Sequence, residues 1–189
     1  MEAITQSGQQ SAVPICSLII PTKDKLNFLK PCMESVLASD GSDAFEIIIV
    51  DNGSVEVETQ QYLQSLSDLL NVRVLSWNAP FNFSAVNNFA AEQCRSNYLC
   101  FLNNDIEIKD PQWLGKLLAV AELDEVGAVG CTLLYPDSSI QHAGIALDEK
   151  TIAQHIGAGE DSGFLAQQGI TLPYAVDAVT AACLIMRKA

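Results

Sequence analysis

The strongest indication of the fold class of this chain is the stretch Tyr98-Leu-Cys-Phe-Leu-Asn-Asn-Asp-Ile106. An apolar run over 98–102 leads directly into two amides and a carboxylate, and apolar residues resume at Ile106. A continuous apolar run of this length predicts a strand buried on both faces. Asn103, Asn104 and Asp105 then lie at the carboxyl end of that strand. In open α/β sheets this is the edge that binds ligands.

Strands and helices alternate on either side of this stretch. We expect further strands at 16–20, 45–50 and 72–75, and helices at 26–37, 58–70, 84–93 and from 110 to about 123. Continuously apolar strands between helices indicate α/β architecture: a three-layer α/β/α sandwich with a mostly parallel central sheet. Ser84 is the predicted N-cap of the third helix, and Asp110-Pro111 the predicted start of the fourth.

The second half of the chain has a different rhythm. Strand-like runs at 127–134, 140–147 and 175–186 are separated by polar loops that contain glycine. These predict mixed or antiparallel strands. A length of 189 residues favours one domain. We expect it over residues 15–189, after a polar and flexible leader at 1–14.

Composition narrows the classes of partner. The net charge of −13 disfavours nucleic acid, which needs clustered Lys and Arg. It also predicts that a diphosphate ligand would meet little fixed positive charge and would need a metal ion. No apolar run reaches the roughly 18 residues that cross a bilayer. The six cysteines form no CxxC pair, and we expect reduced core thiols in the cytosol.

Polar groups end three of the apolar strands. Thr22 follows the first, Asp51 the second, and Asn103–Asp105 the fourth. In a doubly wound sheet these ends meet at one crevice. We expect Asp51 to accept the imide N–H of uracil or a similar base, with Thr22 beside it. Asp105 would bind Mg2+ or Mn2+, which prefer oxygen ligands.

Each of these positions also has an ordinary structural explanation. Asp51-Asn-Gly-Ser54 is a common turn sequence, and Asp105 could cap a helix or a turn. Asn87 and Asn88 lie in an amide-rich segment that could be capping and solvated surface. His142 is a candidate neighbour of the active site, because Gly144 permits close backbone approach; His155 gives a weaker signal. The chain has no GxGxxG, Walker A, GxSxG or HExxH motif.

Taken together, seven motifs in order resemble those of the family-2 glycosyltransferases, and most of all the rhamnosyltransferase-like bacterial branch. The resemblance spans about residues 15 to 188. The motifs are Ser17–Asp24, Ile49–Ser54, Phe81–Asn88, Phe101–Asp105, Pro111–Leu114, Val126–Gly130 and Gln141–Gly144.

The resemblance implies a GT-A fold, a nucleotide-diphospho-sugar donor, a divalent metal and inversion at the anomeric carbon. Pro21, Thr22 and Asp51 match positions that bind the nucleoside. Asn103-Asn104-Asp105 matches the Asp-x-Asp motif, with Asn in place of the first Asp, and gives Asp105 the metal and the catalytic role. Asn87 matches a donor-side segment that often carries an Arg-Asn pair, and here the Arg is absent.

The resemblance also implies an incomplete acceptor half, as in a C-terminally truncated chain. Family members continue past the strand at 179–187 into a Glu-Asp segment that supplies the general base, and no residue here matches it. The expected activity is therefore hexosyl transfer by the whole enzyme. The alternatives are a non-catalytic nucleotide-sugar-binding fragment, or a nucleotidyltransferase, which would need a Gly-rich basic loop after the first strand.

The family context implies polysaccharide biosynthesis, with a glycan or lipid-linked acceptor. It also implies a cytoplasmic protein, with peripheral association at the inner face of the membrane as a further expectation. The sequence does not identify the sugar, the base or the oligomeric state.

Overall fold

The computed structural model describes residues 13–147 and 153–188. The first half alternates β1 (Cys16–Thr22), α1 (Leu26–Leu37), a short 3-10 turn η1 (Ser42–Ala44), β2 (Phe45–Asp51), α2 (Val57–Leu66), β3 (Val72–Ser76), α3 (Phe83–Gln93), β4 (Tyr98–Leu102) and α4 (Trp113–Ala121). The second half contains β5 (Ala128–Gly130), β6 (Leu133–Leu134), β7 (Ile140–His142), β8 (Ile145–Ala146), β9 (Gln154–His155), α5 (Phe164–Gln167) and β10 (Cys183–Arg187).

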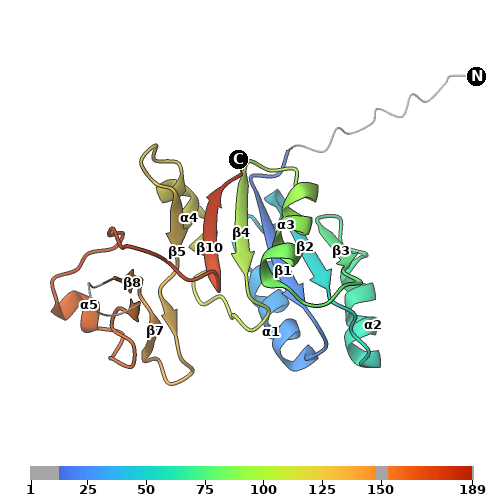
Figure 1. Ribbon diagram of the computed structural model, residues 1–189, viewed down its shortest axis with the longest axis horizontal. Helices are drawn as coiled ribbons and strands as arrows, with labels where there is room; N and C mark the ends of the chain where they lie inside the picture. Colours follow the sequence, from blue (N-terminus) through green and yellow to red (C-terminus); the bar gives the residue numbers. More distant parts are fainter. Residues whose placement is uncertain (1–12, 148–152, 189) are drawn as a thin grey trace, which may run out of the picture.

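Six strands form the central sheet in the order β3-β2-β1-β4-β10-β5. The first four are parallel, and β10 runs antiparallel to both β4 and β5. Figure 1 shows β10 pointing the opposite way between β4 and β5. The predicted parallel sheet and the mixed character of the second half are both confirmed.

Helices cover both faces of the sheet because its strands are apolar on both sides. Ile47 and Ile49 face the larger core, where α1, α2 and α4 pack, while Ile48 faces a smaller core under α3. Figure 1 shows α3 in front of β1 and β2. The three-layer sandwich follows directly from this double burial. All six cysteines are free thiols, and five of them are buried.

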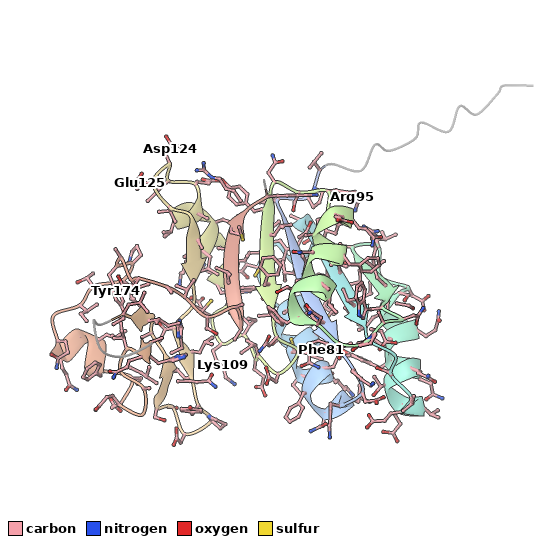
Figure 2. The ribbon with its side chains drawn as sticks, viewed as in Figure 1. Phe81, Arg95, Lys109, Asp124, Glu125 and Tyr174 are labelled. Atoms are coloured by element: carbon pink, nitrogen blue, oxygen red, sulfur yellow. The ribbon has the colours of Figure 1, made fainter. Side chains whose placement is uncertain are left out.

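The amino ends of the strands are held by a buried carboxylate. Glu46 is 1% exposed, and its carboxylate accepts hydrogen bonds from Ser17, Arg73 and Arg95. Burial alone would raise the pKa of Glu46, but these hydrogen bonds outweigh it and hold the pKa below its usual range. This cluster lies at the edge opposite the carboxyl ends, where Figure 2 labels Arg95.

Several predicted boundaries in the first half are wrong by a few residues. The N-cap of α3 is Asn82, whose side chain accepts from the Ala85 N–H at 2.9 Å, and not Ser84. Helix α4 begins at Trp113, because Asp110 instead closes a turn by accepting from the Gln112 N–H. Helix α2 ends at Leu66 and not at residue 70. Leu70 fitted the apolar pattern of the helix, but its side chain is fully exposed and does not pack on the core.

The predicted strands of the second half are wrong in length. The run 127–134 divides at Cys131-Thr132, because β5 pairs with β10 while β6 pairs with β7. The run 140–147 divides at Gly144, whose φ of 109° is incompatible with an extended strand. The predicted run 175–186 is much longer than the observed strand. That strand is β10, which begins at Cys183 and ends at Arg187. The predicted flexible leader falls largely on 1–12, outside the described residues.

The small strands and α5 gather beside the β5 edge of the sheet (Figure 1). They enclose a separate minor core of Ile140, Ala143 and Leu165. Gly144 is required here twice over. Its φ is positive, and a Cβ on it would lie 2.5 Å from Val176 Cγ1. The close approach at Gly144 is thus made by the Val176 side chain, and the role of His142 beside an active site stays a prediction.

Candidate functional site

The carboxyl ends of β1, β2 and β4 form one edge of the sheet. Strand pairing sets Thr22 beside Asp51. The Asn104 side-chain amide donates to the Thr22 hydroxyl at 2.9 Å, which ties the loop after β4 to the end of β1. The ends of β1 and β4 are thus joined by a side-chain hydrogen bond. The end of β2 lies beside the end of β1 because the two strands are paired in register.

A cavity of about 410 Å3 opens at this edge. Five of the predicted site residues line it, and so do five residues that the sequence analysis did not single out. Its lining is Pro21, Thr22, Lys23, Lys25, Phe28, Phe81, Phe83, Asn103, Asn104 and Asp105. Asp51 and Asn87 are not in the lining, and His142 lies in a different cavity.

Asp51 is half-buried and performs the turn role that its sequence context suggested. Its Oδ1 accepts from the Ser54 backbone N–H at 2.9 Å and from the Ser54 hydroxyl at 2.6 Å. Both bonds use the same oxygen. The turn therefore orients the carboxylate, and its other oxygen is not used by Ser54.

The loop between β1 and α1 has an unusual backbone. Asp24 and Lys25 are consecutive non-glycine residues with φ of 51° and 59°. Hydrogen bonds hold them there: the Asp24 N–H donates to the Ser54 hydroxyl, and the Asp24 carboxylate accepts from the N–H groups of Val55 and Glu56. These backbone bonds keep the pKa of Asp24 below its usual value. Such over-determined strain is typical of ligand sites.

This loop delivers two positive charges to the cavity. Lys23 and Lys25 are both exposed on its lining. Neither ammonium forms a salt bridge within the described residues. The expectation that a diphosphate would meet little fixed positive charge is therefore wrong for this site. The net charge of the chain hid a local concentration of Lys next to Thr22.

Three phenylalanines form the apolar part of the lining. Phe28 is 49% exposed and Phe81 63% exposed, with Phe83 beside them. Figure 2 shows Phe81 at the edge where the parallel strands end. Exposed aromatic rings can stack on a flat ligand. The signal in the sequence was the Phe81-Asn-Phe83 repeat at the start of α3.

Asn87 lies one turn into α3 and is 4% exposed. Its amide donates to the Phe83 carbonyl at 2.8 Å. Its Oδ1 is buried and has no hydrogen-bond partner among the described residues. A buried acceptor without a hydrogen bond lowers the free energy of unfolding by about 1–3 kcal/mol. Asn87 therefore destabilises the fold through its Oδ1.

The donor set of the cavity fits a hard divalent cation only in part. Asp105 is exposed and contributes a carboxylate, and Asn103 and Asn104 add amide oxygens. Within the described residues there is no group of three or more His, Cys, Asp or Glu that could hold a metal alone. The site therefore fits Mg2+ or Mn2+ bound through one carboxylate together with ligand phosphates and water.

His142 belongs to a second cavity of about 530 Å3 in the C-terminal half. It is fully buried, and its Nδ1 lies 2.9 Å from Nδ1 of His155. His155 was the weaker candidate of the two in the sequence analysis, yet the two rings form one pair. No helix in the described part of the chain is long and apolar enough to span a membrane.

Comparison with protein families gives one family match. The model described as "Glycosyl transferase family 2" matches residues 17–188. An uncharacterized protein, y4gI of Sinorhizobium fredii, is 41% identical over 180 residues, which are 93% of this chain and 20% of that protein. The O-antigen biosynthesis protein RfbC of Myxococcus xanthus is 38% identical over 182 residues, 93% of this chain and 14% of that protein. The chain thus spans a fifth or less of these curated relatives.

Two solved structures share the fold at low sequence identity. The structure of GalNAc-T7 with UDP, GalNAc and Mn2+ matches with a TM-score of 0.71 and 15% identity, over 94% of this chain and 36% of that one. The mannosyltransferase PcManGT from Pyrobaculum calidifontis, in complex with GDP-Man and Mn2+, matches with a TM-score of 0.58 and 17% identity, over 90% of this chain and 56% of that one. The expected GT-A fold is confirmed.

Proposed function

The chain belongs to glycosyl transferase family 2, and on that premise we propose that it is the donor-binding part of an inverting hexosyltransferase. The donor is a nucleotide-diphospho-sugar, and the acceptor is a hydroxyl of a glycan or a lipid-linked glycan. The observation that carries the proposal is the Asn104–Thr22 hydrogen bond. It brings Asp105, Lys23 and Lys25 to one cavity, so a carboxylate and two ammoniums can act on one diphosphate.

The proposed nucleoside site lies at the ends of β1 and β2. Asp51 offers its second carboxylate oxygen to a base N–H, and the Ser54 turn fixes the orientation of that oxygen. Thr22 lies beside it, and Pro21 lines the same cavity. The phenylalanines supply apolar surface for a flat base. Asn87 is the donor-side residue in this proposal. Its side chain is buried outside the cavity lining, so its part is to hold the first turn of α3, which carries Phe83, by donating to the Phe83 carbonyl.

The proposed diphosphate site lies between the two lysines and Asp105. Opposite charge at close range stabilises the diphosphate as it leaves, and most strongly when its charge develops. A divalent ion held by Asp105, with the amide oxygens of Asn103 and Asn104, would supply Lewis-acid stabilisation of the same leaving oxygens. The strained turn at Asp24-Lys25 positions the Lys25 charge before the ligand arrives.

In the transfer itself, the acceptor oxygen forms a bond to the anomeric carbon while the bond from that carbon to the diphosphate oxygen breaks. The sugar passes through an oxocarbenium-like state. The proton of the acceptor hydroxyl goes to a general base, a role that we assign to none of the described residues. Attack from the face opposite the leaving group inverts the anomeric configuration.

Calorimetric titration with UDP, GDP and dTDP, each with and without Mn2+, tests the proposal. We expect at least one nucleotide to bind, and to bind more tightly when Mn2+ is present. Asp105→Asn removes the single carboxylate of the cavity and should abolish the increase caused by Mn2+. Asp110→Asn is the matched control, because Asp110 is an exposed carboxylate nearby that pairs with Lys116 outside the cavity. An Asp105→Asn protein that keeps the full Mn2+ effect would contradict the assignment.

A further inference from the structure

The segment between β4 and α4 carries Asp105 but forms no helix or strand of its own. Its side chains alternate in direction. Ile106 and Ile108 pack against the main core, while Asp105, Glu107 and Lys109 are exposed. The backbone N–H and C=O groups of an irregular segment must find their partners in other elements or in water. The position of the Asp105 carboxylate therefore depends on the groups that hold this segment from behind.

Helix α1 supplies two of these groups. The Cys32 thiol donates to the Asn103 carbonyl at 3.6 Å. The Ser35 hydroxyl accepts from the Ile108 N–H at 3.0 Å. Side chains three residues apart lie on the same face of a helix, so one face of α1 binds the segment on both sides of Asp105. A thiol is only a weak donor, and Ser35 therefore provides the stronger of the two contacts.

The Ser35 hydroxyl is oriented before it meets the segment. Its hydrogen donates to the Cys32 carbonyl at 2.8 Å, a bond that helical serines commonly make to the preceding turn. The oxygen is then left to accept from the Ile108 N–H. Ser35 and Ile108 are both half-buried. Loss of the hydroxyl would leave this N–H without its partner, and an unpaired amide destabilises the conformation that contains it.

The two sides of Asp105 are held by different elements. On the amino side, the Asn104 amide donates to the end of β1, and the Asn103 N–H donates to the Ala182 carbonyl at 2.9 Å. On the carboxyl side, the contact with α1 is made by Ser35. Without this hydroxyl the carboxyl side loses a hydrogen bond, so the carboxylate can take more orientations.

The same helix also forms part of the charged cavity. Lys25 is the N-cap residue of α1, and Phe28 lies in its first turn. Both line the cavity together with Asp105. One helix therefore carries Lys25 and, through Ser35, holds the segment of Asp105. The two opposite charges proposed to act on one diphosphate are thus connected by a single element.

We propose that Ser35 is a positioning residue for Asp105. By accepting from the Ile108 N–H, it fixes the segment that presents the Asp105 carboxylate to a divalent ion and to the phosphates of the ligand. Attachment of the segment follows from the hydrogen bonds alone, whereas the consequence for metal-assisted binding rests on the proposed function. Ser35 lies outside the cavity lining, so it acts through the backbone of the segment and not on the ligand.

Two further variants make the test specific. Ser39→Ala is the matched control, because Ser39 also supplies a hydroxyl next to α1, and that hydroxyl accepts from the Trp113 indole N–H at 3.0 Å. It removes a similar hydrogen bond but does not touch Ile108. Ser35→Thr keeps the hydroxyl, since a helical threonine can make the same bond to the preceding turn.

The first measurement is hydrogen exchange of the Ile108 amide in the 15N-labelled protein without ligand. In Ser35→Ala we expect this amide to exchange about fivefold faster than in wild type, because it has lost its hydrogen bond. Ser39→Ala and Ser35→Thr should leave the rate unchanged. Urea denaturation should give the two alanine variants similar midpoints, so a difference between them in exchange or binding does not come from global stability.

The second measurement is calorimetric titration with UDP and GDP, each with and without Mn2+. In Ser35→Ala we expect the gain in affinity caused by Mn2+ to fall about tenfold, as is typical when a group that orients a metal ligand is removed. Nucleotide affinity without Mn2+ should not change, since the two lysines and Asp51 are untouched. Ser39→Ala and Ser35→Thr should keep the full gain.

The outcomes separate this inference from the proposed function. Wild-type exchange of the Ile108 amide in Ser35→Ala would overturn the inference, and so would a full Mn2+ gain in that variant. An equal loss of the gain in Ser39→Ala or in Ser35→Thr would also overturn it, because the Ser35 hydroxyl would not be the cause. If Mn2+ gives no gain even in wild type, the metal-assisted part of the proposed function fails, and hydrogen exchange still decides whether Ser35 fixes the segment.

Discussion

The two halves of the molecule build their cavities in different ways. From β1 to β4, polar side chains follow the ends of long, doubly buried strands, and strand register sets Thr22 beside Asp51. From β5 to β10, the strands have two to five residues, and the second cavity is closed by contacts between distant segments, such as Thr180 with His142. The first site is a product of local βα units, and the second is a product of tertiary packing.

The halves also differ in charge. Lys23, Lys25 and Asp105 line the first cavity, whereas none of the described residues that line the second is Asp, Glu, Lys or Arg. Fixed charges suit a diphosphate, and neutral donors and acceptors suit hydroxyls. The changes below test whether this difference in charge matters for stability and for binding.

The largest expected effect is on the stability of the first half. Glu46→Ala removes the carboxylate that accepts hydrogen bonds from Ser17, Arg73 and Arg95. We expect the free energy of unfolding to fall by about 3 kcal/mol. Urea denaturation followed by circular dichroism measures it. Glu107→Gln removes an exposed partner of Lys109 and should cost under about 1 kcal/mol. A Glu46→Ala protein no less stable than this control would contradict the role of the cluster.

The next effect is on nucleotide affinity. The double change Lys23→Gln, Lys25→Gln removes both positive charges from the first cavity, and we expect UDP or GDP to bind about tenfold or more weakly, or about 1.4 kcal/mol. The difference from wild type should shrink as salt is added. Lys30→Gln, an exposed lysine of α1 paired with Glu34, should change nothing in the calorimetric titration. Equal affinities for the double variant and wild type would exclude the lysines from the site.

A smaller change separates stability from function within the same loop. Lys25 has a left-handed backbone conformation, which destabilises a residue with a side chain by about 1–2 kcal/mol. Lys25→Gly removes this strain. Part of the gain in stability is offset because glycine has more conformational entropy in the unfolded chain. We expect the protein to become more stable by up to about 1 kcal/mol while nucleotide affinity falls. Loss of stability in thermal unfolding would show that the turn is not strained.

The smallest effect is the pH response of the second half. The folded pKa of His142 lies below the ordinary value of 6.5. Between these two values the unfolded chain binds more protons than the folded one, so the free energy of unfolding falls as the pH drops below about 6.5. Imidazole NMR titration should give His142 the lower pKa directly, and His142→Gln should reduce the pH slope of stability. A measured His142 pKa above 6.5 would refute this.

The sequence predicted the first half well because its signals are local. The apolar runs that became β2 and β4 are buried by helices on both sides, so their continuous pattern identified the elements with only small boundary errors. The same periodicity extended α2 to Leu70, since an apolar residue counts equally whether it faces the core or, as here, the solvent. Asn82 was missed as the cap of α3 because Ser84 offered an equally good cap by composition.

The second half was predicted less well because its strands depend on partners far away in sequence. The residues around Cys131 carry no local pattern that predicts the strand partners. In the structure β5 pairs with β10, while β6 pairs with β7. Likewise, the partner of His142 is thirteen residues away on another strand, and its sequence context gave no sign of pairing. Lys23 and Lys25 were not predicted as site residues, because the analysis of charge used the net charge of the chain. A net charge does not tell where the individual charges lie.

The family, the α/β class and the edge of the sheet where Thr22, Asp51 and Asp105 would lie all follow from the amino-acid sequence. Strand periodicity and the direction of parallel strands are enough for that, because both are properties of short consecutive segments. The grouping of side chains into cavities follows only from the folded chain: the Asn104–Thr22 hydrogen bond, the two lysines that share a lining with Asp105, and the histidine pair of the second cavity. Such groupings depend on contacts between segments that are distant in the chain, and these contacts arise only when the whole core has packed.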